Sequence, residues 1–150
     1  MKRTNKNKGG FTIIELTIVM IIIAAILSAV LFAGQSSANT SRITSALASI
    51  KALQTAAVAY YNNNGGSYTG LSLASLASNN YLPANFTSGT NQNPWLGNIA
   101  VTPDTNASYF DITFTNVPSA AATILTNAVS KLVQTAPSYT ASSQTWSAAF

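Results

Sequence analysis

The sequence contains no cysteine and no histidine. Their absence excludes disulfide bonds, thiolate or imidazole metal ligands, and catalysis by a cysteine nucleophile or a histidine base. Acidic residues are scarce as well: Asp104 and Asp111 are the only two acidic residues beyond the first 33 residues. Two carboxylates are too few for a calcium cage. We therefore expect no catalytic residues, no metal site and no cofactor, and we do not expect an enzyme.

Charge of either sign is sparse, with seven Lys or Arg against three Asp or Glu in 150 residues. The cations are Lys2, Arg3, Lys6 and Lys8 near the start, then Arg42, Lys51 and Lys131. From residue 11 onward the three cations balance the three acids, so no basic face is available to neutralise phosphates. No specific nucleic-acid partner is expected. The polar surface must be neutral, since the chain has 18 Ser, 18 Thr and 15 Asn.

Residues 11–33 form a run of 23 residues that carries a single charge. A helix of this length can cross roughly 30 Å of hydrocarbon, and we expect residues 11–34 to form a membrane helix. The alternative is a buried core helix, but the rest of the chain is too small and too polar to surround it. The leading cations predict a cytoplasmic N-terminus and place everything after residue 34 outside the cytoplasm.

The Gly9-Gly10 pair precedes the apolar run, whereas a secretory signal is cleaved after its apolar run. Cleavage at this pair would remove residues 1–10 and retain the helix. The segment from Lys8 to Leu16, KGGFTIIEL, closely resembles the processing motif of type IV pilins and related pseudopilins. The resemblance implies that a prepilin peptidase recognises Lys8, Gly9 and Gly10, cuts between Gly10 and Phe11, and methylates the new Phe11 amine.

Glu15 is the single charge of the apolar run. A carboxylate in a membrane helix costs about 2.5 to 3.5 kcal/mol unless it lies near an interface or is paired. Its partner can be the Phe11 amine of its own chain, four residues away on the same helical face, or that of a neighbouring subunit. The family resemblance favours the neighbouring subunit, because it implies that Glu15 aligns an incoming subunit with the N-terminus of one already assembled.

The helical pattern continues through residues 35–64 without a proline. Apolar residues recur at steps of three and four, at Ile43, Leu47, Ile50, Leu53, Ala57 and Tyr61, which predicts an amphipathic helix. Asn62-Asn63-Asn64-Gly65-Gly66 is a strong stop signal. We therefore expect one long helix over about residues 11–61, its first half apolar and its second half packed on a head.

Residues 65–150 are expected to form that globular head. The pattern predicts a short loop helix within 71–81, a turn at Asn93-Pro94-Trp95, and strands over 98–102 and 109–115. It also predicts a helix from Pro118 to just before Pro137, with Leu132 on its apolar face. Within the second strand Phe110, Ile112 and Phe114 should share one face. The tail with Tyr139 and Trp146 should return as a hairpin or an edge strand. The fold class is therefore α+β, with a small antiparallel sheet laid on the long helix.

Two head segments, residues 81–97 and 110–120, resemble type IVb pilins, including thin conjugative pilins. Those pilins commonly carry a disulfide from a cysteine shortly after the Val-Pro pair, and this chain has Ala121-Ala122 there instead. A disulfide constrains the unfolded chain by about 2 to 4 kcal/mol. Trp95 and Trp146 are our candidates for compensating anchors, and ordinary core burial explains them equally well.

The function that this resemblance implies is structural. It predicts the major pilin of a type IV pilus, a homopolymer stored in the bacterial inner membrane and then built into an extracellular filament by an assembly machinery. The alternatives are a type II secretion pseudopilin, a minor pilin, and an adhesin or DNA-receptor pilin. The secretion pseudopilin is less favoured because its head resembles an acid-rich calcium-binding design, which this sequence lacks.

The maturation hypothesis predicts that fibres sheared from cells begin at an N-methylated Phe11. The cut removes the four leading cations and leaves the apolar helix in the product. N-terminal sequencing and mass spectrometry of sheared fibres test this expectation. Any first residue other than Phe11 would contradict it.

Overall fold

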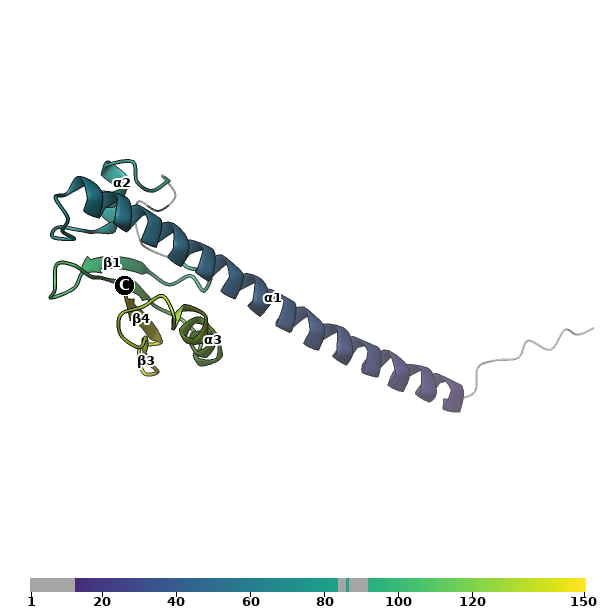
Figure 1. Cartoon of the computed structure of the whole chain (residues 1–150). Coiled ribbons are helices and arrows are strands. Elements are labelled where there is room, and N and C mark those ends of the chain that lie inside the picture. Colours follow the sequence, from purple (N-terminus) through teal and green to yellow (C-terminus); the bar gives the residue numbers. More distant parts are fainter. Residues whose placement is uncertain (1–12, 84–85, 87–91) are drawn as a thin grey trace, which may run out of the picture. The chain divides into compact units, whose positions relative to one another are not determined.

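The computed structural model describes residues 13–83, 86 and 92–150 (Figure 1). The chain divides into two compact units, Met1–Ala38 and Asn39–Phe150. Helix α1, Ile13–Asn63, contributes to both units. Residues 11 and 12 of the predicted long helix lie outside the described residues. The predicted stop is confirmed, because Gly65 and Gly66 adopt φ values of +67° and +78° and the Gly66 N–H donates to the Tyr61 carbonyl (3.0 Å).

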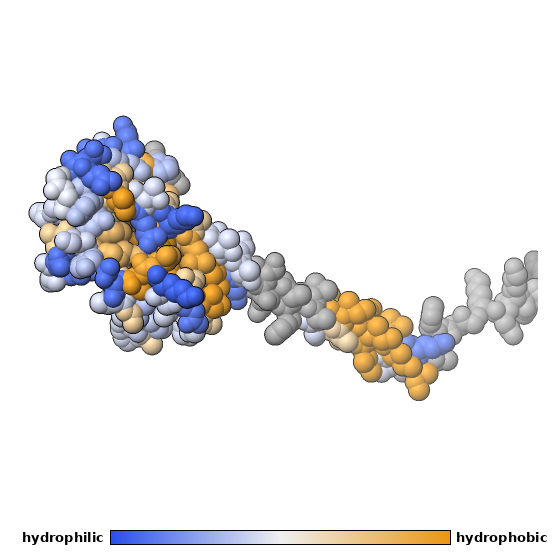
Figure 2. Space-filling view, in the orientation of Figure 1, coloured by the Kyte–Doolittle hydropathy of each residue, from blue (hydrophilic) through white to orange (hydrophobic). Residues whose placement is uncertain are grey.

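Residues 18–27 of α1 are all apolar, so this part of the helix is apolar around its whole circumference. Residues 18–23 are consecutive large apolar side chains, all exposed, and the exposed fractions of Ile14 and Met20 reach 70% and 63%. In Figure 2 apolar side chains cover the visible face of this segment. Across the part of the chain that the structure describes, no helix combines the length and the apolarity required to cross a membrane.

The second unit contains a four-stranded antiparallel sheet in the order β1-β2-β4-β3. Its strands are β1 (Ile99–Pro103), β2 (Phe110–Phe114), β3 (Ser138–Thr140) and β4 (Thr145–Ala149). The register places Val101 opposite Ile112 and Phe114 opposite Trp146. The two predicted strands are confirmed, and the tail returns as the predicted hairpin. Its second strand, β4, lies inside the sheet, and β3 forms the edge.

One face of the sheet packs within a core shared with α1. Along β2, Phe110, Ile112 and Phe114 are buried as the alternation predicts, while Asp111 and Thr113 are only partly buried. The α1 residues in the same core are Ala46, Ile50, Leu53, Ala56 and Ala57. Three of these five are alanines. Figure 1 shows the sheet alongside this part of α1. The predicted α+β fold is confirmed.

Helix α2, Leu73–Ser78, is the predicted short loop helix. A capping box starts it, since the Ser75 N–H donates to Ser72 Oγ (3.1 Å) and the Ser72 N–H donates to Ser75 Oγ (2.8 Å). Leu73 and Leu76 face the core and are buried. Local capping and two apolar anchors thus account for a helix of only six residues.

Helix α3, Ser119–Val129, starts directly after Pro118 as predicted but ends earlier than expected. The prediction extended it to just before Pro137 and placed Leu132 on its buried face, whereas Leu132 is 62% exposed. The reason is the chain reversal that β3 requires. The Leu132 N–H donates to the Val129 carbonyl (2.8 Å) in a tight turn, and the Gln134 N–H then donates to the Ala149 carbonyl (2.9 Å) of β4.

Trp146 links α3 to the sheet. Its side chain is completely buried, its ring lies 6.0 Å from that of Phe114, and its Nε1–H donates to Thr126 Oγ1 (3.1 Å). Trp95, the other proposed anchor, is only partly buried. The structure therefore assigns the core role to Trp146 in preference to Trp95.

Replacing Trp146 should destabilise the head far more than replacing Trp95. Trp146→Ala removes a fully buried aromatic side chain, which typically costs about 3 to 5 kcal/mol of unfolding free energy. Trp95→Ala is the matched control and should cost less than half of that. Urea unfolding of the full chain in a mild detergent, followed by circular dichroism, measures both. Equal losses would contradict this assignment.

Candidate functional site

The predicted processing residues Lys8, Gly9, Gly10 and Phe11 lie outside the described residues. Glu15 is described, and it lies exposed in the first turn of α1. The first turn of a helix has N–H groups without intrahelical acceptors and a partial positive charge, so a carboxylate is favourable there. The structure thus gives Glu15 a helix-terminal position, with exposed apolar residues on either side of it.

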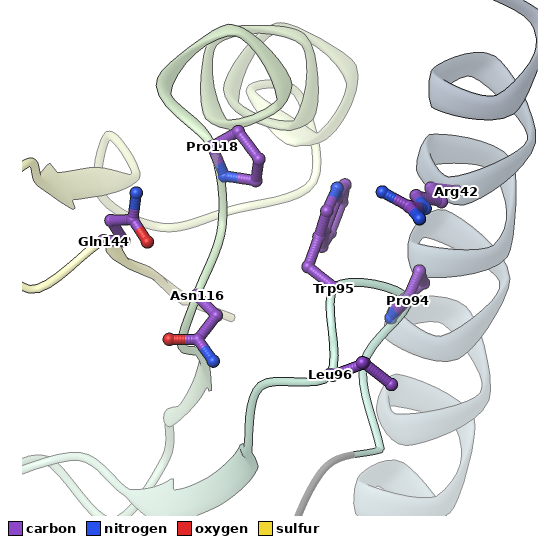
Figure 3. A pocket seen from close by; sticks show the side chains of 7 residues that line it. All are labelled: Arg42, Pro94, Trp95, Leu96, Asn116, Pro118 and Gln144. Carbon is purple, nitrogen blue, oxygen red and sulfur yellow. The ribbon is translucent and has the colours of Figure 1, made fainter. Parts of the chain in front are cut away.

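The head has a groove of about 510 Å³ beside Trp95 (Figure 3). Its walls come from four segments of the second unit: α1, the loop before β1, the segment after β2, and the turn between β3 and β4. The lining residues are Arg42, Pro94, Trp95, Leu96, Asn116, Pro118 and Gln144. Sequence reasoning proposed Trp95 as a packing anchor and did not predict a groove, because three of these segments are turns or loops far apart in the chain.

Asn93 holds one wall of the groove in place. It is a buried polar residue, with only 3% of its surface exposed. Its Oδ1 accepts from the N–H groups of Trp95 and Gly97, both at 2.9 Å, and its Nδ2 donates to the Thr115 carbonyl at 2.6 Å. One side chain therefore shapes the loop and fastens it to the end of β2.

Gly97 has to be a glycine because the Trp95 loop passes so close to the end of β2. A Cβ atom at this position would collide with the backbone carbonyl of Thr115 and with the Asn93 amide nitrogen. The Asn-Pro-Trp-Leu-Gly sequence predicts a turn, and the turn is confirmed. The close approach of two backbones was not predictable, because Thr115 lies 22 residues from Asn93.

Unusual backbone conformations converge on the groove. Only four non-glycine residues of the described chain have positive φ, and three of them line the groove: Leu96 (+59°), Asn116 (+58°) and Gln144 (+49°). This conformation is costly for a leucine, and such residues cluster at functional sites. Leu96 is also 72% exposed, so core burial does not explain its conformation.

Among the described residues, Arg42 is the only charged one that lines the groove. The two head acids lie elsewhere. Asp104 accepts hydrogen bonds from the N–H and hydroxyl of Thr105 in the turn after β1. Asp111 lies within β2, where partial burial, and secondarily the charge of Asp104, raise the pKa of its carboxyl above the usual value. The groove therefore has a local positive charge with no acid in its lining.

Two family comparisons match successive parts of the chain. Residues 5–31 match the prokaryotic N-terminal methylation motif, and residues 33–144 match the family described as PilS N terminal. A comparison with curated proteins finds no match. A methylation motif that precedes a long helix and a small α+β head defines a type IV pilin. The chain belongs to the PilS N-terminal family. Its motif implies a membrane-anchored precursor that a prepilin peptidase processes and that is then assembled into pili.

Asn93 should be needed for the stability of the head. Asn93→Asp retains the acceptor for Trp95 and Gly97 but loses the donor to Thr115, and it places a buried carboxylate beside a carbonyl oxygen. Leaving buried polar groups unsatisfied costs about 1 to 3 kcal/mol each. Urea unfolding at neutral pH should show a loss of at least that size. The exposed Asn127→Asp is the control and should change stability little; equal effects of the two would contradict the role of Asn93.

Proposed function

We propose that this pilin is the major structural subunit of a type IV pilus. One observation carries the proposal: a single chain joins the N-terminal methylation motif, a helix whose residues 18–27 are apolar and exposed on all sides, and a PilS-family head. A helix of this kind has to be covered by lipid or by other helices. Polymerisation covers it with the same segment of neighbouring subunits.

The proposal assigns each part of the chain a stage in assembly. Residues 1–10 are a basic leader that is removed, and residues 11–34 form the helix that lies first in the inner membrane and then in the filament core. Residues 35–64 are the amphipathic half of the same helix, and residues 65–150 are the globular head outside the cytoplasm. The leading cations keep the N-terminus cytoplasmic until the peptidase cuts after Gly10. The likeness of the head to type IVb pilins stays a prediction.

Glu15 supplies the specific contact in this scheme. Glu15 lies in the first turn of α1, and the Phe11 amine that the cut creates is expected four residues before it on the same helical face. Apolar contacts alone give no net driving force when a helix exchanges lipid for another helix. Pairing between Glu15 and the Phe11 amine of a neighbouring subunit therefore sets the register of the incoming subunit, and the assembly machinery supplies the energy.

The composition of the head favours a major pilin over the alternatives. Its surface is rich in hydroxyl and amide groups and carries few charges, so closely spaced copies do not repel one another. A secretion pseudopilin or a minor pilin is the second candidate, and the shared methylation motif fits it equally well. Abundance in sheared surface fibres distinguishes these functions, because a major pilin should be their main protein.

Removing the carboxylate of Glu15 should block assembly without blocking processing. In Glu15→Ala we expect cleavage after Gly10 at the normal rate and incorporation into fibres reduced at least about tenfold, since breaking a buried ion pair costs about 3 to 5 kcal/mol. Immunoblots of whole cells and sheared fibres measure the two steps separately.

The matched control is Asp104→Ala, which removes one acid from the head and should leave fibre yield close to normal. Glu15→Gln keeps the size of the side chain and should behave like Glu15→Ala, because the charge is what matters. Normal fibre yield from both Glu15 variants would contradict the proposed role.

A further inference from the structure

The groove beside Trp95 combines a flat aromatic ring with polar groups on either side of it. Figure 3 shows the Trp95 indole standing between the Arg42 side chain, which extends from α1, and the ring of Pro118. Asn116 and Gln144 contribute side-chain amides, each with a donor and an acceptor. All of these residues belong to the second unit of the chain. The lining thus offers one cation, two amides and one aromatic face.

The polar groups of the groove are not used by the fold. Among the residues that the structure describes, no hydrogen bond or ion pair engages the side chains of Arg42, Asn116 or Gln144. The guanidinium has five N–H donors arranged in a fork that fits a carboxylate in bidentate geometry. None of the described lining residues is an acid that could occupy that fork. A ligand with a carboxylate would satisfy it.

The main chain of the groove is, in contrast, largely engaged or lacks donors. The Leu96 N–H donates to the Asn93 carbonyl (3.0 Å), and the Trp95 N–H donates to Asn93 Oδ1. Pro94 and Pro118 have no N–H group to offer. An extended peptide, which binds mainly through backbone hydrogen bonds, would find few partners here. Recognition has to come from the side chains.

Side-chain amides and an aromatic face suit a sugar. Amides exchange hydrogen bonds with hydroxyl groups in both directions, and the partly buried indole offers an apolar face for the C–H side of a pyranose ring. A nucleic acid is a poor fit, since one cation neutralises only one phosphate. We propose that this groove binds a saccharide that carries a carboxylate, with Arg42 on the carboxylate, Trp95 under the ring, and Asn116 and Gln144 on the hydroxyls.

The groove is preformed for such a ligand. The contacts of Asn93 fix the Trp95 loop to the end of β2, and Leu96, Asn116 and Gln144 are already held at positive φ. Preorganisation of this kind lowers the entropy cost of binding. Binding at one groove does not require polymerisation. In a pilus built from this subunit, the same groove would repeat along the fibre, and weak single sites would combine into high avidity.

The test uses the full-length chain in a mild detergent and follows tryptophan fluorescence. Trp95 and Trp146 are the only two tryptophans, and Trp146 is fully buried, so a ligand at the groove should change the emission of Trp95. The probes are 3′-sialyllactose, which carries a carboxylate, lactose as its neutral counterpart, and a short acidic peptide. We expect saturable binding of sialyllactose, at least tenfold weaker binding of lactose, and no saturable binding of the peptide.

Variants of Arg42 test whether its guanidinium binds the carboxylate of the saccharide. Arg42→Gln should weaken sialyllactose binding about tenfold or more, because it removes charge-assisted hydrogen bonds. Arg42→Lys keeps the charge but not the fork of donors, so its affinity should lie between those of the unchanged chain and Arg42→Gln. Lys131→Gln removes one exposed cation outside the groove and should bind like the unchanged chain. Equal binding of sialyllactose and lactose, tighter binding of the acidic peptide, no saturable binding of any probe, or equal behaviour of Arg42→Gln and Lys131→Gln would each overturn the proposal. Arg42 is exposed, so its variants should keep the fold.

Discussion

Burial of one sheet face against α1 is the interaction on which the described head depends. The chain has no cysteine, so no disulfide bond can hold the sheet to the helix. Four short strands, none longer than five residues, have little stability of their own in water. The α1 residues between Ala46 and Ala57 supply the missing apolar surface, because they share one buried core with Phe110 and Phe114.

The groove follows from how this core is closed. Strand β2 ends at Phe114, and the chain has to change direction between Phe114 and the start of α3. The loop before β1 lies next to this segment. Asn93 joins the two where they meet, through its hydrogen bond to the Thr115 carbonyl. The conformations that this junction imposes on Leu96 and Asn116 place their side chains at the surface. Packing inside the head thereby determines what the groove presents outside.

Most of the fold could be predicted from local sequence patterns. The predictions that failed concern features that depend on segments distant in the chain. The end of α1, helix α2 and the alternating face of β2 depend on neighbours within about five residues, and all three predictions are confirmed. The end of α3 depends on a strand that returns some 20 residues later, so helical spacing alone placed Leu132 wrongly. The groove depends on four segments separated in the chain, and no single segment carries its signal. Glu15, by contrast, stands out because its charge conflicts with its surroundings.

If this protein forms the proposed homopolymer, the edges of its sheet have a consequence for assembly. An open strand edge invites another strand to add to it and so promotes amyloid-like aggregation. Here β1 ends in a proline and is contacted by α2, while β3 has only three residues and is contacted by α3. Both edges are thus short or covered. Neighbouring subunits therefore have little opportunity to pair through their strand edges, a contact that is hard to reverse. They are left to contact one another through side chains, and such contacts can form and break as a fibre grows.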